Sequence, residues 1–469
     1  MWIYVEDINA LLSCYGHPDN PTPHLDYMAQ QGLLFTRAYT ISPVCSPARS
    51  GNILGVAPTS VGAHQHHSSR TVEAGNFLPD SIVPLPQLFR QAGYYTFNQG
   101  KDDYNFIYDR RKLYEGDFIS DYWYTFEGLG HWRDSARGTR PFFGQIQLSG
   151  GKHALGNGYR GEERYADLSW KNPDSVQVPP YYPDHPVIRE DWAAHHDAVR
   201  ITDHEVGEIL DQLKADDLLE RTVVFFFSDH GYKGIRHKQF CYEGGIHIPL
   251  IIADPGGHFL DRKGQTDSQL VSSIDLAPTT LGLAGLPIPS FMEGRDLFGA
   301  SPPRQQVIAS RDRCDFSVDR IRAVRSEHFK YIRNYLPDRA YTQPSYRDRR
   351  PEFTVIRDLY QAGKLTAAQA KYWQASKPVE ELFDLRTDPH EIQNLADDPA
   401  YQSVLRAHRD TLEAWVEASD DQGQYPENLE DLRFIYERWG ERCVDPIFDT
   451  VKNSWRANTP RWVRQGHSR

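Results

Sequence analysis

The chain has 469 residues, of which 39% are hydrophobic and 12% aromatic, and its formal net charge is −12. This length exceeds one ordinary core, so we expect a large domain and a smaller one. The acidic balance argues against nonspecific nucleic-acid binding, and the sequence has no run of about 20 apolar residues that would predict a membrane span. Five cysteines at unrelated spacings predict neither a disulfide framework nor a zinc site.

The first residues, "MWIYVED", predict a strand that ends in two carboxylates. No charged segment followed by an apolar segment precedes this strand. The sequence therefore leaves the localisation open. A cytoplasmic protein fits, and a periplasmic or secreted one is favoured if a leader has been removed.

Apolar runs bounded by turn residues predict strands at Trp2–Val5, Tyr94–Phe97, Phe142–Leu148, Val223–Phe227 and Leu250–Ala253. Helical spacing of apolar residues predicts a helix over Asp203–Leu213. Continuous apolar strands that alternate with helices are typical of an α/β fold with a mostly parallel sheet covered by helices on both faces.

The pattern changes after about Ser310. The segment "IRAVRSEHFKYIRNY" predicts two antiparallel strands, and "EELFDLRTDPHEIQNLA" predicts a strand, a turn and the start of a helix. We therefore expect a catalytic α/β domain over residues 1–310. A smaller α+β domain with an antiparallel sheet is expected over residues 311–469.

Charged side chains follow four of the predicted strands, and sites in open α/β sheets form beyond the carboxyl ends of the strands. The groups are Glu6 and Asp7, then Lys101, then Lys152 and His153, then Asp229 and His230. One such group is more often a helix cap or a turn, but four together predict a site. The carboxylates favour Ca²⁺ or Mg²⁺, and the cations, with Arg49 and Lys238, favour a tetrahedral oxyanion.

Six segments in this order resemble the type I sulfatases, the formylglycine-dependent family of the alkaline-phosphatase superfamily. One is "CSPARSGNILG", which contains C-x-P-x-R at Cys45, Pro47 and Arg49. The others are "YVEDINALLSCYGHPDN", "FFFSDHG", "HKQFCYEGGIHIPLII", "VSSIDLAPTTLGLAGLPIP" and "ELFDLRTDPHEIQNLA". C-x-P-x-R alone could arise by chance, but the five other matching segments make the resemblance specific. The resemblance implies an alkaline-phosphatase-like fold and a sulfatase that acts on a sulfated carbohydrate.

The resemblance also implies a role for each matching residue. A formylglycine-generating enzyme would oxidise Cys45 to the aldehyde whose hydrate attacks sulfur, and Arg49 would steady that group. Lys101 and Lys238 would hold sulfate oxygens, and His153 would bind sulfate or protonate the leaving oxygen. Ca²⁺, or Mg²⁺ in its place, would be bound by Glu6, Asp7, Asp229 and His230.

The sequence departs from the family pattern at several positions. Asp103 stands where many members have a histidine, and Ala48 replaces the usual serine of the signature. The loop "GAHQHHSSR" offers a sugar subsite, or equally a solvated polar loop, through His64, His66, His67 and Arg70. The segment 107–138 is rich in tyrosine and tryptophan, which suit either sugar stacking or packing of the site wall.

Three other interpretations stay open. Hydrolysis of N-sulfoglucosamine is the nearest rival, because the signature region also resembles that of sulfamidases. A phosphodiesterase or phosphonate monoester hydrolase of the same superfamily could also carry C-x-P-x-R. A binding protein that has kept the fold is disfavoured by the intact set of nucleophile, carboxylates and cations.

Overall fold

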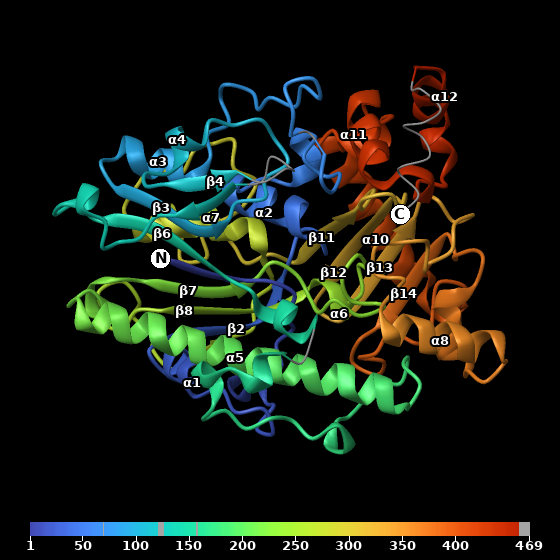
Figure 1. The fold of residues 1–469 in the computed structure, drawn as a ribbon, viewed down its shortest axis with the longest axis horizontal. Helices are drawn as coiled ribbons and strands as arrows, with labels where there is room; N and C mark the ends of the chain where they lie inside the picture. The colour runs from blue at the N-terminus through green and yellow to red at the C-terminus, as the bar shows by residue number, and fades with distance from the viewer. Residues whose placement is uncertain (69, 121–125, 156–157, 459–469) are drawn as a thin grey trace.

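The computed structural model of the chain describes residues 1–68, 70–120, 126–155 and 158–458 (Figure 1). Ten strands form its large sheet: β1 (Trp2–Val5), β2 (Gly32–Tyr39), β3 (Tyr95–Lys101), β4 (Phe118–Ser120), β5 (Phe126–Leu129), β6 (Phe142–Leu148), β7 (Val224–Ser228), β8 (His247–Ala253), β9 (Gln265–Asp267) and β10 (Val271–Ser272). Across these described residues the order is β10-β2-β8-β7-β1-β6-β3-β5-β4, and β9 also pairs with β2. The predicted α/β class is confirmed.

The large sheet is mixed rather than uniformly parallel. Strand β1 runs parallel to both β6 and β7, whereas β8 runs antiparallel to both β7 and β2. A parallel partner needs a crossover connection, usually a helix of a dozen or more residues. Between β7 and β8 the chain has only a loop and α6 (Glu243–Ile246). It does not cross the sheet, so β8 starts at the end where β7 finishes and runs antiparallel to it.

Both faces of the large sheet are covered, which explains the continuous apolar strands. Trp2 and Tyr4 pack in one cluster, and Ile3 and Val5 in another, because successive side chains of a strand point to opposite faces. The first cluster includes residues of α2 (Cys45–Leu54), α3 (Leu85–Gln91), α4 (Arg110–Leu113) and α7 (Leu276–Leu283). The second includes residues of α1 (Pro23–Gln30) and α5 (Pro186–Ala215).

A separate four-stranded antiparallel sheet follows, as the sequence predicts. Its strands lie in chain order: β11 (Gln306–Arg311), β12 (Ile321–Ser326), β13 (Phe329–Asn334) and β14 (Glu380–Asp384). The helices of this part are α8 (Pro351–Gln361), α9 (Ala367–Ala370), α10 (Gln402–Ala418), α11 (Leu429–Trp439) and α12 (Asp449–Asn458). The sheet begins a few residues before position 311, and turns rather than a helix follow β14 until residue 399.

The two sheets share one apolar cluster. It combines Ala309 and Ala323 of the small sheet with Trp192 of α5 and Ile246 of α6. Figure 1 shows the small sheet beside the end of the large one, with α10 against its strands and α8 and α12 further out. Loops of the C-terminal part therefore lie where the strands of the large sheet end. None of the described helices has the length and apolarity needed to cross a membrane.

Candidate active site

Three adjacent strands bring the acidic residues together. Val5 of β1 is in register with Leu148 of β6 and Ser228 of β7, so the residues that follow these strands meet at one edge. The Asp7 backbone N–H donates to Asp229 Oδ1 at 3.1 Å, and the His230 backbone N–H donates to the same oxygen at 2.9 Å. All these side chains, with that of Glu6, are buried. The structure therefore brings three of the four predicted metal-binding residues, Asp7, Asp229 and His230, within reach of one ion, whereas the carboxylate of Glu6 pairs with cationic side chains beside them.

Two glycines let the loop after β6 approach this cluster. A Cβ on Gly150 would lie 2.1 Å from the carbonyl oxygen of Glu6, and a Cβ on Gly151 would lie 2.1 Å from that of Asp7. Neither position can carry a side chain without moving the backbone. The close approach places Lys152 against the carboxylate of Glu6.

Cys45 is the first residue of α2 and is buried with the rest of that helix. Its Sγ lies 3.3 Å from His230 Nε2 and 3.2 Å from Lys238 Nζ. A Cβ on Gly51 would lie 2.9 Å from Ile41 Cγ2, so small residues allow the helix to pack this deeply. The helix N-terminus also presents its positive dipole to the sulfur.

Arg49, one turn further along α2, is also buried. Its Nη2 lies 3.2 Å from Glu6 Oε1 and 3.6 Å from Asp229 Oδ2, and its Nη1 donates to Gln147 Oε1 at 2.7 Å. The guanidinium carbon lies 4.4 Å from the centre of the Tyr4 ring. Arg49 thus neutralises two carboxylates while Gln147 and Tyr4, which the sequence analysis did not single out, fix its orientation.

Two lysines that act on the charge of Cys45 pair with different carboxylates. Lys101 Nζ lies 3.1 Å from Glu6 Oε1 and 2.8 Å from Asp103 Oδ2. Lys238 Nζ donates to Asp7 Oδ1 at 2.9 Å as well as to Cys45 Sγ. Both ammonium groups can therefore donate to an anion held beside Cys45.

The charges of this cluster shift its titration. Burial opposes ionisation of Cys45, but Lys101, Lys238 and His230 outweigh it and lower the pKa of the thiol well below its usual value. For Glu6, burial is likewise outweighed by Lys101, Lys152 and Arg49, and the pKa falls to about 2. Burial prevails at Asp229 and raises its pKa to about 6, despite the opposing charge of His230. At Asp229 the cost of burial thus exceeds the stabilisation by the nearby cations.

The residues present fit a hard divalent cation. Ligand atoms of Asp7, Cys45, Asp229 and His230 lie within 4.8 Å of one another. Asp229 Oδ2 is buried and has no hydrogen-bond partner, which is costly for a carboxylate oxygen. A cation coordinated by Asp7 and Asp229 would satisfy that oxygen, and carboxylate oxygens are the ligands that Ca²⁺ and Mg²⁺ prefer.

The structure does not bring His153 into this cluster. His153 lies on the 3-10 turn Gly150–Leu155, and its Nε2 is 3.5 Å from Glu205 Oε1 of α5. Its ring packs edge-on against Tyr165. The neighbouring Lys152, to which the sequence analysis assigns no role of its own, contacts Glu6 instead.

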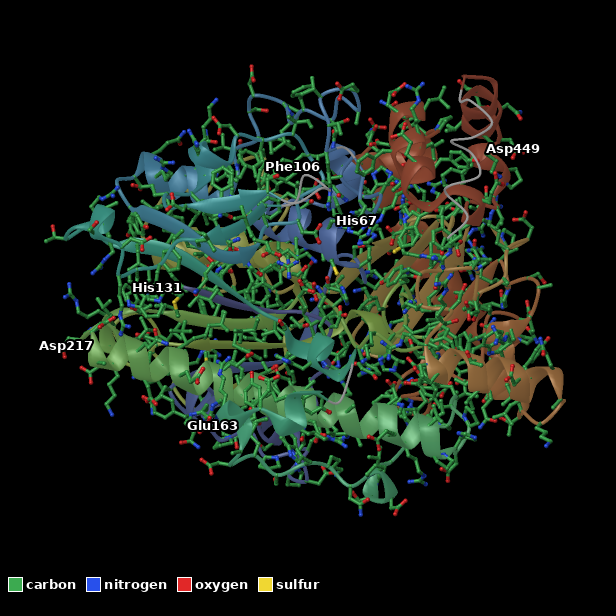
Figure 2. All side chains as sticks on the ribbon, in the orientation of Figure 1. His67, Phe106, His131, Glu163, Asp217 and Asp449 are labelled. Atoms are coloured by element: carbon green, nitrogen blue, oxygen red, sulfur yellow. The ribbon has the colours of Figure 1, made fainter. Side chains whose placement is uncertain are left out.

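The candidate sugar-binding residues separate into two groups. Arg70 pairs with Asp103, and the backbone N–H of His67 donates to Ser46 Oγ at 3.3 Å, next to the nucleophile position. Figure 2 shows His67 between the large sheet and the C-terminal elements, far from His131 and Asp217 at the other end of that sheet. His64 instead lines a cavity of about 230 Å³ with residues 422–431 of the C-terminal part.

Part of the aromatic segment 107–138 lies outside the described residues, namely Asp121, Tyr122, Trp123, Tyr124 and Thr125. Within the described part, Tyr108 packs at a tilt against Tyr104 and Phe106, which precede the segment, and Trp132 packs against Phe97. These rings are largely buried, so they pack the wall of the site and do not offer an open surface on which a sugar could stack.

Left-handed backbone conformations gather at this site. The residues with positive φ include Asp7 (58°), His67 (57°), Asp103 (59°), Gln239 (74°) and Asp315 (49°). Side chains other than glycine rarely adopt this conformation, and such strain concentrates where the surrounding structure aims functional groups. Tertiary contacts therefore hold the backbone of these polar loops in conformations that their residues do not favour by themselves.

Comparisons with known proteins agree with this geometry. A profile of the family described as sulfatase matches residues 1–286, and one described as "N-sulphoglucosamine sulphohydrolase, C-terminal" matches residues 230–374. An ulvan-active sulfatase of Formosa agariphila is 32% identical, over 97% of this chain and 80% of the relative. Human N-sulphoglucosamine sulphohydrolase is 28% identical over 86% of each chain.

Among solved structures, phosphonate monoester hydrolase of Agrobacterium radiobacter has a TM-score of 0.61 at 16% identity. The alignment covers 89% of this chain and 95% of that protein. At this identity the likeness establishes a shared fold only.

Proposed function

The chain belongs to the sulfatase family, and we propose that it hydrolyses sulfate esters on a sulfated carbohydrate, with Cys45 as the precursor of its nucleophile. The family uses a divalent metal and formylglycine. We propose Ca²⁺ as the metal, and a formylglycine-generating enzyme as the partner that oxidises Cys45. We propose a carbohydrate substrate because the relative from Formosa agariphila, which is 32% identical, is an ulvan-active sulfatase.

One observation carries the proposal. The Cys45 sulfur lies at a helix N-terminus, within 3.3 Å of both Lys238 Nζ and His230 Nε2, and beside the carboxylates of Asp7 and Asp229. A buried structural cysteine does not need two nitrogen donors and a partly unsatisfied acidic cluster around it. A nucleophile that attacks an anion beside a metal needs all of these.

The chain's own residues divide the work of the reaction. Lys101 and Lys238 would bind sulfate oxygens, where negative charge grows in the transition state. Arg49 would hold Glu6 and Asp229 in place for the metal, which when bound supplies positive charge to a sulfate oxygen. His153 would protonate the leaving oxygen, after its ring turns from Glu205 toward the substrate.

Hydrolysis of N-sulfoglucosamine is the second candidate. The C-terminal profile of N-sulphoglucosamine sulphohydrolase matches residues 230–374, a segment that includes Lys238 and the first three strands of the small sheet. The catalytic cluster would contact only the sulfate group. Whether an O-sulfate or an N-sulfate is hydrolysed therefore depends on the loops that bind the sugar.

A panel of substrates tests these proposals. The protein, coexpressed with a formylglycine-generating enzyme, is assayed on defined O-sulfated oligosaccharides, N-sulfoglucosamine, an aryl sulfate and an aryl phosphodiester. We expect the highest kcat/KM on an O-sulfated oligosaccharide and no activity in Cys45→Ala. A higher kcat/KM on N-sulfoglucosamine would favour the second candidate, and a preference for the phosphodiester would contradict both.

A further inference from the structure

A second cluster of metal-ligating side chains lies outside the catalytic carboxylates and shares no residue with them. It joins His66 and His67, from the loop after the 3-10 turn Pro58–Val61, to Cys314 and Asp315, which follow β11. The backbone fixes this meeting, because His66 forms a parallel β-bridge with Cys314 and its N–H donates to Arg313 O at 3.0 Å. Residues 248 positions apart in the chain are thereby held side by side.

The side chains of this cluster converge on one point. His66 Nδ1 lies 3.3 Å from Asp315 Oδ2, and His67 Nδ1 lies 2.8 Å from Asp315 Oδ1. Cys314 Sγ lies 3.5 Å from His66 Nδ1. The ligand atoms of the two histidines and Asp315 all lie within 4.8 Å of one another.

Without a metal, the Nδ1 atoms of His66 and His67 can donate to the two oxygens of Asp315, and Gln239 Nε2 donates to Cys314 Sγ at 2.7 Å, so hydrogen bonds already hold the donor atoms in place. The one proton on His66 Nδ1 can donate to Asp315 or to Cys314, but not to both. The two imidazole rings stack with centroids 3.7 Å apart, so making both cationic would be unfavourable. Arg438 Nη1 lies 3.4 Å from His67 Nδ1. A divalent cation bound by His66, His67 and Asp315 would replace these hydrogen bonds, and Cys314 Sγ, 3.5 Å from His66 Nδ1, is the candidate for a fourth ligand.

The donor set and its dimensions indicate the kind of ion. Two imidazoles, one carboxylate and one thiolate suit Zn²⁺, whereas Ca²⁺ and Mg²⁺ prefer oxygen alone. Tetrahedral zinc with bonds of about 2.0–2.3 Å places its ligand atoms about 3.3–3.8 Å apart. Two of the three measured separations fall in that range, and the third is shorter by half an ångström. Burial of Cys314 and Asp315 limits competition from water.

We propose that His66, His67, Cys314 and Asp315 form a second metal site, which binds Zn²⁺ or a similar borderline transition-metal ion. The site would link the loop next to the nucleophile helix to the start of the C-terminal part, because the His67 N–H also contacts Ser46. The left-handed backbone of Asp315 and His67 fits this role, since it aims both side chains at one point.

Cobalt titration of the full chain tests the site. The Cys45→Ala variant is saturated with Ca²⁺, so that the catalytic cluster lacks its thiol and competes little for cobalt. It is then titrated with Co²⁺ and followed by absorption. We expect one further Co²⁺ per chain, with the visible bands of tetrahedral cobalt and a sulfur-to-cobalt charge-transfer band. In that background, Cys314→Ala should lose the charge-transfer band, and Asp315→Asn should weaken binding at least about a hundredfold.

Matched controls separate the site from other donors. Cys14→Ala and His64→Gln remove a half-buried thiol and a neighbouring histidine of another cavity, and they should leave the spectrum unchanged. If Asp315→Asn does not fold, His67→Gln serves instead, and Zn²⁺ should raise the Tm of the parent but not of this variant. The proposal is overturned if no further Co²⁺ binds, or if Cys314→Ala and His67→Gln bind it as the parent does. It is also overturned if His67→Gln raises KM for a carbohydrate sulfate while the parent binds no Co²⁺.

Discussion

The ammonium group of Lys238 lies 3.2 Å from the sulfur of Cys45, although the two residues are 193 positions apart in the chain. Its second contact, at 2.9 Å, is with Asp7. One lysine thus bridges the nucleophile position and the acidic cluster. The position of this lysine depends on how the loop between β7 and α6 is held.

Replacing Cys45 should abolish sulfatase activity. Coexpression with a formylglycine-generating enzyme should yield an aldehyde at this position, detected by intact mass and peptide mapping. Cys45→Ala and Cys45→Ser should both fold with the parent's Tm, because the residue is small and its neighbours are polar. Full turnover by Cys45→Ala would place the nucleophile elsewhere.

Removing the metal should inactivate the enzyme reversibly. Dialysis against a chelator should lower kcat/KM at least about a hundredfold, since a metal contributes several kcal/mol to stabilising charge in the transition state. Added Ca²⁺ should restore the activity. Asp229→Asn keeps the shape of the side chain but removes the charge, so elemental analysis should show less metal in this variant. Active enzyme without any divalent metal would contradict the assignment.

Loss of either sulfate-binding lysine should slow the reaction without unfolding the protein. We expect Lys101→Met and Lys238→Met to lower kcat/KM by about 10²–10³, the usual effect of removing one donor to developing negative charge. Lys112, an exposed lysine of α4, provides the control, and Lys112→Met should have no effect. Unchanged kinetics in Lys101→Met would remove that residue from the sulfate pocket.

The sequence could place the ends of the central strands because buried strands leave continuous apolar runs and adjacent parallel strands end at one edge. Glu6 and Asp229 meet for this reason. The direction of side chains in loops has no such signal. Lys152 and His153 are neighbours, yet the 3-10 turn points one toward Glu6 and the other toward Glu205. His64 and His67 differ likewise, because each contacts a different segment of the C-terminal part: His64 lines a cavity with Glu427, and His67 pairs with Asp315.

Lys152 and His153 should have distinct effects on leaving groups. A sugar alcohol needs a proton to depart, whereas a nitrophenol does not. His153→Ala should therefore lower kcat/KM more on a carbohydrate sulfate than on nitrophenyl sulfate, and Lys152→Met should lower both equally. Equal losses in His153→Ala would mean that this residue binds sulfate rather than donating a proton.

The last prediction concerns Arg347, which comes from the C-terminal part but holds the loop that carries Lys238. Its guanidinium donates to the carbonyl oxygens of Lys233 at 2.9 Å and Lys238 at 3.1 Å, and to Gln239 Oε1 at 2.8 Å. Gln239 has a left-handed backbone, so the loop needs this support. Removing the guanidinium would leave buried acceptors unpaired, at about 1–3 kcal/mol for each group.

We expect Arg347→Met to lower kcat/KM at least about tenfold, and Arg347→Lys, which keeps the charge but only one donor group, to restore part of the loss. Combination with Lys238→Met separates positioning from general destabilisation. If Arg347 acts by placing Lys238, the double variant should be little slower than Lys238→Met alone, because the lysine it positions is already gone. Fully additive losses would show that Arg347 only stabilises the fold. Arg339→Met, which removes an arginine paired with Asp445 in the same part of the chain, is the matched control and should retain the parent's kcat/KM.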